Sequence, residues 1–307
     1  MKKSLYLFIT VMACLFLVDR GVYFGLHTIE EKVTTGQSVG KVNYFNTIKD
    51  SVDNLVFGSS RAVHHVNTNY FKSSVFNMGA DGTKIGYAAG LISTLKKKNQ
   101  TILVHIDHNT LFSKTYKGGD MLSLINETRD NEELKRFLKE NYKSKVVTSQ
   151  VVNSFVYNGK VLGIIKNYLM PKKGYDDQMG FAPIVPSENQ KKIFKKLLAQ
   201  NKAKLNSNIY KPLEVNIKTD KFINQITNII NQNKSRLIFF TSPSLHKVDE
   251  EVKLKIKNYF LNKGITYFDH IDVLGKENKD FWKDFTHLSE KGSVEYTRLL
   301  LEKLNNQ

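Results

Sequence analysis

The stretch Asn54-Leu-Val-Phe-Gly-Ser-Ser-Arg61 decides how the rest of the chain is interpreted. Its short apolar run stops at Gly58, and two serines then lead into Ala62-Val-His-His65, a segment able to begin a helix. Open α/β folds place their chemistry at the carboxyl edge of the sheet, where a buried strand of this kind ends. We therefore expect a serine hydroxyl at this edge. Because serine is also among the best helix N-cap residues, a capping role for Ser59 or Ser60 is the alternative.

Four further apolar segments alternate with helical patterns along the chain. The predicted strands are 54–57, 74–77, 101–106, 236–241 and 264–269, and the predicted helices between and after them are 84–97, 221–233, 250–262 and 288–304. Strands separated by helices imply a mostly parallel sheet covered by helices on both faces. The predicted fold class is therefore α/β: a three-layer α/β/α sandwich with a mostly parallel, five-stranded sheet of the flavodoxin-like type.

Residues 111–215 interrupt this alternation. Segments 131–141 and 190–201 predict helices, the second of them basic and amphipathic, whereas 164–186 contains three prolines and two glycines and predicts a loop. We expect this insertion to lie over the carboxyl edge of the sheet and to shape a substrate cleft.

The N-terminus has the pattern of a membrane-targeting segment. Two lysines precede an apolar run over residues 5–18, and a second apolar patch at 21–26 follows one Asp-Arg pair. Positive charge before an apolar run is typical of export signals and orients the lysines to the cytoplasm. Counting to residue 26 gives the length of about 20 residues that a span needs. We expect residues 1–26 to form an uncleaved membrane anchor with the domain outside the cytoplasm, on the periplasmic or extracellular face. A cleaved signal, which would give a secreted protein, and a buried soluble helix are the alternatives.

The remaining domain organisation follows from the same pass. Residues 27–50 are polar without a strong pattern and predict a stalk. Residues 51–307 are expected to form the α/β domain that carries the insertion.

The charge balance excludes few partners by itself. The formal net charge is +17 and the pI is about 9.6, which suggests an anionic neighbour such as a nucleic acid, an acidic glycopolymer or a lipid surface. The lysines are scattered through amphipathic segments and no nucleic-acid motif is present, so we expect a solvated basic surface and no nucleic-acid partner. The single cysteine, Cys14, lies in the N-terminal apolar segment, and the folded part therefore has neither a disulfide nor a cysteine metal site.

A second informative stretch, Phe281-Trp-Lys-Asp-Phe-Thr-His-Leu-Ser289, precedes the last predicted helix. Asp284 lies three residues before His287, so its carboxylate can accept a hydrogen bond from the imidazole Nδ1–H. The ring Nε2 is then left to take a proton from a serine hydroxyl. The alternative is an Asp-Thr capping pair at the start of the helix, with a partly buried histidine.

Taken together, the ordered blocks Gly58-Ser-Ser60, Asn77-x-x-x-x-Gly82, Asn109 and Asp284-Phe-Thr-His287-Leu288 resemble the SGNH/GDSL hydrolase superfamily. The resemblance runs from about residue 54 to the C-terminus and leaves the insertion outside. It implies that Ser60 is the nucleophile, His287 the general base and Asp284 its orienting acid. It also implies an oxyanion hole made by the backbone N–H groups of Ser60 and Gly82 and the side chain of Asn109. The first block together with an N-terminal anchor is similar to a membrane-associated branch that acts on cell-envelope polymers.

This sequence departs from the family pattern in two blocks. Gly-Ser-Ser-Arg stands where the family often has Gly-Asp-Ser-Leu, so Ser59 is the alternative nucleophile. Asp107-His-Asn109 stands in place of Gly-x-Asn-Asp, so Asp107 or His108 could hold the position assigned to Asn109. Residues 77–82 could equally form an ordinary strand-ending turn.

The resemblance implies a serine esterase or O-acyltransferase acting on acylated, in particular acetylated, cell-envelope glycans through an acyl-enzyme at Ser60. No metal or organic cofactor is expected, and a transferase would need a membrane partner that delivers activated acyl groups. The alternative is a non-catalytic binding protein of the same fold for an acidic polysaccharide or an envelope assembly. For catalysis, Ser60 Oγ should lie within about 3 Å of His287 Nε2.

Other polar residues near these blocks have open roles. Arg61 could hold an acidic substrate or pair with a carboxylate. His64, His65, His105 and His108 are expected to be structural or to line the cleft, because no His-x-x-x-His spacing or carboxylate pairing supports a metal site.

Overall fold

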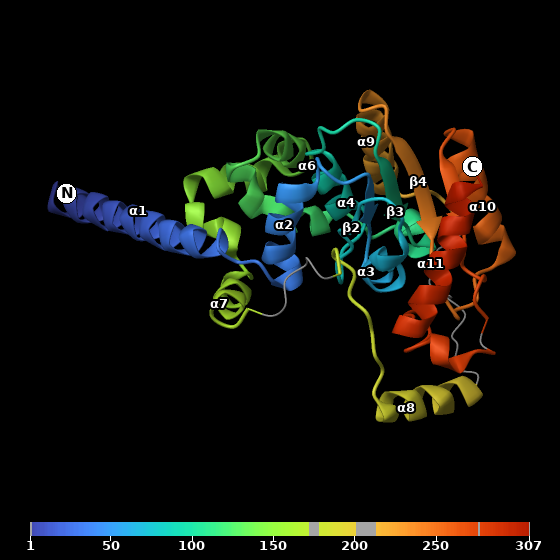
Figure 1. Cartoon of the computed structure of the whole chain (residues 1–307). Coiled ribbons are helices and arrows are strands. Elements are labelled where there is room, and N and C mark those ends of the chain that lie inside the picture. The colour runs from blue at the N-terminus through green and yellow to red at the C-terminus, as the bar shows by residue number, and fades with distance from the viewer. Residues whose placement is uncertain (1, 172–177, 201–212, 276, 307) are drawn as a thin grey trace. The chain divides into compact units, whose positions relative to one another are not determined.

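The computed structural model describes residues 2–171, 178–200, 213–275 and 277–306, and it divides into two compact units (Figure 1). The first, here called the helical unit, consists of Met1–Asn46 and Leu122–Gly174. The second, the α/β unit, consists of Thr47–Met121 and Tyr175–Gln307. Each unit is thus assembled from two separate stretches of the chain.

The α/β unit is built on a five-stranded sheet in which every pair of neighbouring strands is parallel. The strand order is β2-β1-β3-β4-β5. The strands are β1 (Asn54–Phe57), β2 (Val75–Asn77), β3 (Thr101–His105), β4 (Arg236–Thr241) and β5 (Thr266–Asp269). The central strands β1 and β3 bury almost every side chain, as expected of strands covered on both faces. The predicted α/β class and its five strands are confirmed.

Helices flank this sheet. They are α3 (Ser60–His65), α4 (Ile85–Ile92), α5 (His108–Phe112), α9 (Ile217–Gln232), α10 (Glu250–Asn262) and α11 (Glu290–Asn305). The chain reverses its direction along the sheet after β2, so right-handed crossovers place α3 on one face and α4, α9 and α10 on the other. In agreement, α11 packs on α3 and α4 packs on α9.

The reversal makes the gap between β1 and β3 a topological switch point. Connections leave these neighbouring strands in opposite directions, which opens a crevice beyond their carboxyl ends. Ligands of open α/β sheets bind in such crevices. The segments after β1 and β3 are therefore the first place to look for a site.

Three short elements and one longer helix complete the α/β unit. These are η2 (Thr68–Tyr70), η5 (Lys279–Phe281), the beginning of η3 (Gly119–Arg129) and α8 (Glu188–Ala199). Ser187 and Gln190 form a reciprocal capping box at the start of α8, which matches the predicted basic helix. The end of that predicted helix and residues 201–212 of the insertion lie outside the described residues.

The helical unit contains α1 (Lys2–Glu30), η1 (Gly36–Gly40), the first part of α2 (Lys41–Ile48), the rest of η3, α6 (Glu132–Val151), η4 (Asn153–Tyr157) and α7 (Val161–Leu169). The α1 helix is long and apolar enough to cross a membrane, and none of its most apolar window is buried. An N-terminal apolar helix was predicted, and it is present.

The predicted stalk is not an extended segment. Residues 27–50 are mostly helical, because α1 continues to Glu30 and η1 and α2 follow. Glu30 is buried, and its carboxylate accepts hydrogen bonds from Tyr157 Oη at 2.7 Å and Asn126 Nδ2 at 2.6 Å. The composition of residues 27–50 shows only that they are polar, and it gives no sign of partners so distant in the sequence.

The predicted loop over residues 164–186 also differs from the structure, since α7 occupies its beginning. Every proline and every glycine that suggested a loop comes after α7 ends, the first of them being Pro171. The prediction therefore extended the effect of these residues too far toward the N-terminus. Residues 172–177 lie outside the described part of the chain.

Candidate active site

Gly58 turns the chain from β1 into α3. Its φ is +145°, a conformation that L-residues with a side chain rarely adopt. A Cβ at this position would lie 2.6 Å from the Cβ of His105 and 2.9 Å from that of Ala62. The close approach of β1, α3 and β3 thus requires glycine here.

The two serines after Gly58 have different roles. Ser59 is the N-cap of α3, and its Oγ accepts a hydrogen bond from the Arg61 N–H at 3.3 Å. Ser60 is the first residue of the helix and presents its hydroxyl at the carboxyl edge of the sheet. The capping alternative therefore applies to Ser59 and leaves Ser60 Oγ for another partner.

Asn77, at the end of β2, holds α3 in place. Its Nδ2 donates to the carbonyl oxygens of Ala62 and Val66, both at 2.9 Å, and its Oδ1 accepts from the Gly79 N–H at 2.9 Å. This buried amide satisfies the end of a short helix that has few hydrogen bonds of its own. The asparagine of the second block is thus a structural residue.

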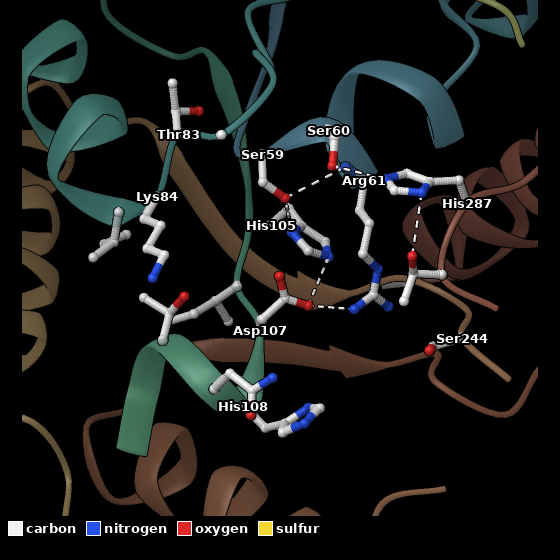
Figure 2. Close-up of a pocket in the computed structure, with 16 residues that line it drawn as sticks. Ser59, Ser60, Arg61, Thr83, Lys84, His105, Asp107, His108, Ser244 and His287 are labelled. Atoms are coloured by element: carbon white, nitrogen blue, oxygen red, sulfur yellow. Dashed lines mark hydrogen bonds and ion pairs between the residues drawn. The ribbon is translucent and has the colours of Figure 1, made fainter. Parts of the chain in front are cut away.

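The partner of Ser60 is His287. Ser60 Oγ lies 2.9 Å from His287 Nε2, and the two side chains face each other in Figure 2. On the other side of the ring, Nδ1 lies 3.0 Å from each carboxylate oxygen of Asp284. The Ser60–His287 distance expected for catalysis is met.

The carboxylate of Asp284 is held by the turn that carries it. Its Oδ1 accepts the backbone N–H groups of Thr286 and His287, each at 2.9 Å, and the Thr286 hydroxyl at 3.0 Å. Burial raises the pKa of Asp284, but hydrogen bonds from the His287 ring and the Thr286 backbone outweigh it, so that the pKa lies well below its ordinary value. Asp284 is therefore ionised and fixes Nδ1 as the protonated nitrogen of His287.

His65 fixes the same turn from α3. Its ring is fully buried, and Nε2 accepts the Leu288 N–H at 3.1 Å. Burial lowers the pKa of His65 well below its ordinary value, as this acceptor role requires of a neutral ring. Sequence reasoning named His65 but missed its role, for which the only local signal is its place in the helix that begins with Ser60.

Trp282 anchors the other side of the turn. It forms an antiparallel bridge with Leu288, and its buried indole N–H donates to the Gly275 carbonyl at 3.0 Å. Between them, the Lys283 N–H donates to the His287 carbonyl at 2.9 Å. No pattern in the sequence marks Trp282 for this role, because its partner is a backbone carbonyl.

Arg61 is buried and pairs with a carboxylate. Its guanidinium forms an ion pair with Asp107 (Figure 2). It also donates to the Ser242 hydroxyl and the Pro243 carbonyl, at 3.2 and 3.3 Å. Burial raises the pKa of Asp107, but the positive charge of Arg61 outweighs this effect, and the pKa is lowered to about 2. Of the two roles open to Arg61, the structure thus favours the internal ion pair, which links α3 to the ends of β3 and β4.

A cleft of about 350 Å³ lies beside Ser60 and His287. Gly82 and Asn109 both line it, as do Lys84, His108 and Ser244, some of which Figure 2 labels. Within the part of the chain that the structure describes, neither the backbone N–H groups of Ser60 and Gly82 nor the Asn109 side chain has a hydrogen-bond partner. Gly82 has a φ of +73° and open space where a Cβ would be. The cleft therefore has spare donors near the Ser60 hydroxyl.

The other histidines near the cleft, His64, His105 and His108, interact with neighbouring groups of the protein. His64 bonds with the Ala182 carbonyl at 2.6 Å and with Asp81 at 3.0 Å. His105 lies 3.5 Å from Ser59 Oγ and 3.2 Å from Ser242 Oγ. Burial lowers the pKa of His105 to about 3 and that of His108 to about 4, so both rings are neutral at pH 7. Among the described residues, no group of three or more His, Cys, Asp or Glu side chains is placed to hold a metal ion.

The structure thus brings together every residue that the sequence nominated, with Ser60, His287 and Asp284 in one hydrogen-bonded chain and with Gly82 and Asn109 in the wall of the adjoining cleft. A hydroxyl with a base, an orienting carboxylate and spare N–H donors is the set of groups that acyl transfer requires. Comparison of the sequence with protein-family models and with curated proteins finds no match.

Proposed function

We propose that this protein is a serine esterase or O-acyltransferase that works through an acyl-enzyme at Ser60. The observation that carries the proposal is the relay from Ser60 Oγ to His287 Nε2 at 2.9 Å and from His287 Nδ1 to Asp284 at 3.0 Å. Ser60 and His287 are separated by 227 positions in the chain, so local capping does not account for their contact. Their meeting at the mouth of a cleft favours a catalytic role.

In the first half of the reaction, Ser60 Oγ attacks the acyl carbonyl of an ester and His287 Nε2 takes the hydroxyl proton. The bond from the acyl carbon to the leaving oxygen then breaks, and His287 returns the proton to that oxygen. Asp284 stabilises the imidazolium that forms between these steps. The product is an acyl group on Ser60 and a free alcohol.

The negative charge on the carbonyl oxygen needs hydrogen-bond donors. The backbone N–H groups of Ser60 and Gly82 and the side-chain amide of Asn109 are proposed to supply them, since all three residues line the cleft and these three groups have no hydrogen-bond partner among the described residues. Losing one such donor typically lowers turnover by about 10²–10³-fold.

In the second half, water or a sugar hydroxyl attacks the acyl-enzyme, and His287 first accepts and then returns the proton. Hydrolysis and O-acyl transfer therefore share one intermediate. The proposed substrates are acylated, in particular acetylated, glycans of the cell envelope, an assignment supported by the resemblance to SGNH hydrolases and by the N-terminal helix. A transferase would also require a membrane partner that supplies the acyl group.

We further propose that α1 is retained as an anchor and that the catalytic unit lies outside the cytoplasm. The C-terminal part of α1 is built into the helical unit: Glu30 binds Tyr157 and Asn126, and the Arg129 guanidinium lies 4.4 Å from the centre of the Tyr23 ring. Cleavage after this part of the helix would remove the Tyr23 and Glu30 side chains that residues 126–157 contact. Lys2 and Lys3 favour a cytoplasmic N-terminus.

The test uses the full-length protein in detergent micelles, treated with a fluorophosphonate probe and assayed for hydrolysis of p-nitrophenyl acetate. We expect the probe to label wild type at Ser60 and to leave Ser60→Ala unlabelled. Turnover should be lost in both Ser60→Ala and His287→Ala. Ser59→Ala is the matched comparison, because it removes a neighbouring hydroxyl that serves as a helix cap, and labelling at Ser60 should persist in it.

The outcomes separate the alternatives. Labelling that disappears in Ser59→Ala but survives in Ser60→Ala would move the nucleophile by one residue. A folded protein that is neither labelled nor active would contradict the acyl-enzyme and favour a binding protein for an acidic polysaccharide.

A further inference from the structure

The helical unit exposes a cluster of large apolar side chains beyond those of α1. On α7 the exposed fraction is 84% for Leu162 and 68% for Leu169, whereas Ile164 on the opposite side of the helix is buried. The full cluster, here called the apolar face, consists of Val147, Val151, Val152, Leu162, Ile165, Tyr168, Leu169 and Met170. So many exposed apolar side chains in one unit, on α7 and at the end of α6, mark an interaction surface.

Part of this face is fixed to α1 at a defined level. The carboxylate of Asp19 accepts the N–H groups of Asn153 and Ser154 at 2.8 and 2.9 Å and the Ser154 hydroxyl at 2.6 Å. Arg20 donates to the Val151 carbonyl at 3.3 Å and forms an ion pair with Asp19 at 3.1 Å. The end of α6, with Val151 and Val152, therefore lies beside the Asp19–Arg20 turn of α1.

The length of α1 gives the depth of that level. A hydrocarbon layer of about 30 Å takes about 20 helical residues, which from Leu5 extend to Phe24. Asp19 is then about 21 Å beyond Leu5, which is inside this layer, and a tilt of the helix keeps it inside. A charged pair at this depth has to be satisfied by partners, and the bonds to residues 151–154 satisfy it. Val151 and Val152 are exposed at the same level, and a hydrocarbon environment favours exposed apolar side chains.

α7 continues the same surface. It packs against α1 and follows η4, which also packs against α1 (Figure 1). The exposed apolar side of α7 bears one cation, Lys166, and Lys143 and Lys145 on α6 are exposed as well. An apolar helix side with lysines near it is typical of helices that lie in the interface of a bilayer with anionic lipids.

From these observations we propose that the apolar face, formed by α7 and the end of α6, is inserted into the surface of the bilayer that α1 crosses. The occupant is lipid, because α7 packs against α1 and the end of α6 is fixed to α1 inside the hydrocarbon layer, near the depth where α1 leaves it. The protein is thus attached by a transmembrane helix and also by an interfacial platform that holds the helical unit against the membrane. This inference rests on the proposed membrane anchor and is independent of the proposed chemistry.

The test measures depth with spin labels in the full-length protein, reconstituted alone into vesicles of phosphatidylcholine and phosphatidylglycerol. The native Cys14 reports on α1. In a Cys14→Ser background, single labels are placed by Leu162→Cys, Leu169→Cys and, as the aqueous control, Glu302→Cys on α11. All four positions are exposed, so the labels displace no packed side chain. Collision rates with oxygen, which partitions into lipid, are compared with those of a water-soluble nickel complex.

We expect the ratio of oxygen to nickel collisions at positions 162 and 169 to exceed that at 302 several-fold and to approach that at Cys14. Lipid-like values at Cys14 with water-like values at 162 and 169 would overturn the platform while leaving the anchor intact. The vesicles contain no other protein, so the apolar face would then be in contact with water. That result would assign the face to a protein partner that the sample lacks. Water-like values at Cys14 would overturn the proposed anchor and the platform together. Esterase activity of the same sample reports independently on the proposed chemistry.

Discussion

At the scale of single residues, Asp284 is expected to affect the rate of the reaction more than the binding of substrate. Asp284→Asn replaces an acceptor by an amide that can donate to Nδ1, which favours the tautomer with the proton on Nε2. Such a ring cannot take the proton of Ser60. We predict that kcat falls by about 10³–10⁴-fold with little change in KM, as measured by steady-state ester hydrolysis.

The control for this change is Lys283→Gln. Lys283 Nζ lies 3.5 Å from Asp284 Oδ2 in a partly exposed ion pair, which contributes little to stability. Its turnover should stay near that of the wild type. Equal losses of kcat in the two variants would show that charge near the turn, and not the tautomer of His287, is what matters.

The buried histidines of the α/β unit predict a second residue-scale effect, a loss of stability in mild acid. Burial lowers the pKa to about 3 for His105, about 4 for His108 and about 4 for His270. In the unfolded chain a histidine pKa is about 6.5, so below that pH the unfolded state takes up protons that the folded state refuses. The free energy of unfolding therefore keeps its full value above pH 6.5 and decreases as the pH falls toward 4. At pH 5 each histidine costs on the order of 2 kcal/mol.

Urea unfolding, followed by the fluorescence of the only tryptophan, Trp282, reports on the α/β unit at pH 7.5 and pH 5. The midpoint should drop at the lower pH, and His270→Gln should reduce that drop. His270 is suited to this comparison because it lies outside the cleft. A midpoint that does not change between the two pH values would contradict the prediction.

At the scale of secondary-structure elements, the junction between β1 and α3 determines where Ser60, the proposed nucleophile, lies. Gly58→Ala adds a Cβ that clashes with His105 and Ala62 and forces an unfavourable φ. We predict a loss of several kcal/mol in the free energy of unfolding and a displaced Ser60, measured by urea unfolding and by probe labelling. Gly119→Ala is the matched control, since nothing lies within 4 Å of its added Cβ. Similar stability in the two variants would mean that the junction relaxes easily.

Elements with a strong local pattern were predictable from the sequence. All five strands and the flanking helices α4, α9, α10 and α11 follow from apolar runs and periodicity, which depend on neighbouring residues alone. The helix at 161–169 was missed because prolines and glycines follow it closely. Ser60, Asp284 and His287 were found by their order in the chain. In contrast, the Arg61–Asp107 pair joins segments whose approach depends on the completed sheet, and the role of His65 depends on a backbone N–H donor at Leu288.

At the scale of the whole molecule, the C-terminal part of α1 is expected to stabilise the helical unit. Deletion of residues 2–18 leaves Asp19, Tyr23 and Glu30 in place, and deletion of residues 2–30 removes all three. We predict that limited proteolysis spares 122–171 after the first deletion and cleaves it rapidly after the second, because Tyr157 and Asn126 lose the carboxylate that they bind. Equal resistance of the two proteins to proteolysis would contradict this dependence. As a control, urea unfolding of the α/β unit, followed by the fluorescence of Trp282, should be alike in both.

The grouping of the chain into two units was the least predictable feature. The sequence suggested one domain over residues 51–307 with an insertion, after an anchor and a stalk. In the structure, residues from the expected stalk and the expected insertion belong to the same unit. The buried Glu30 and its partners explain why, since a carboxylate between polar residues looks solvated until its distant donors are known.

With α1 as the proposed membrane anchor, the division of the chain has a consequence for the release of the protein from the membrane. Because each unit is made of two stretches, the backbone passes between the units three times, after Asn46, after Met121 and after Gly174. A protease that cuts the first passage leaves the other two intact, and α1 stays bound to residues 126–157 through the contacts of Asp19, Tyr23 and Glu30. A single nick at that passage would therefore not shed the α/β unit, whereas a protein tied to its anchor by one linker is released by one cut.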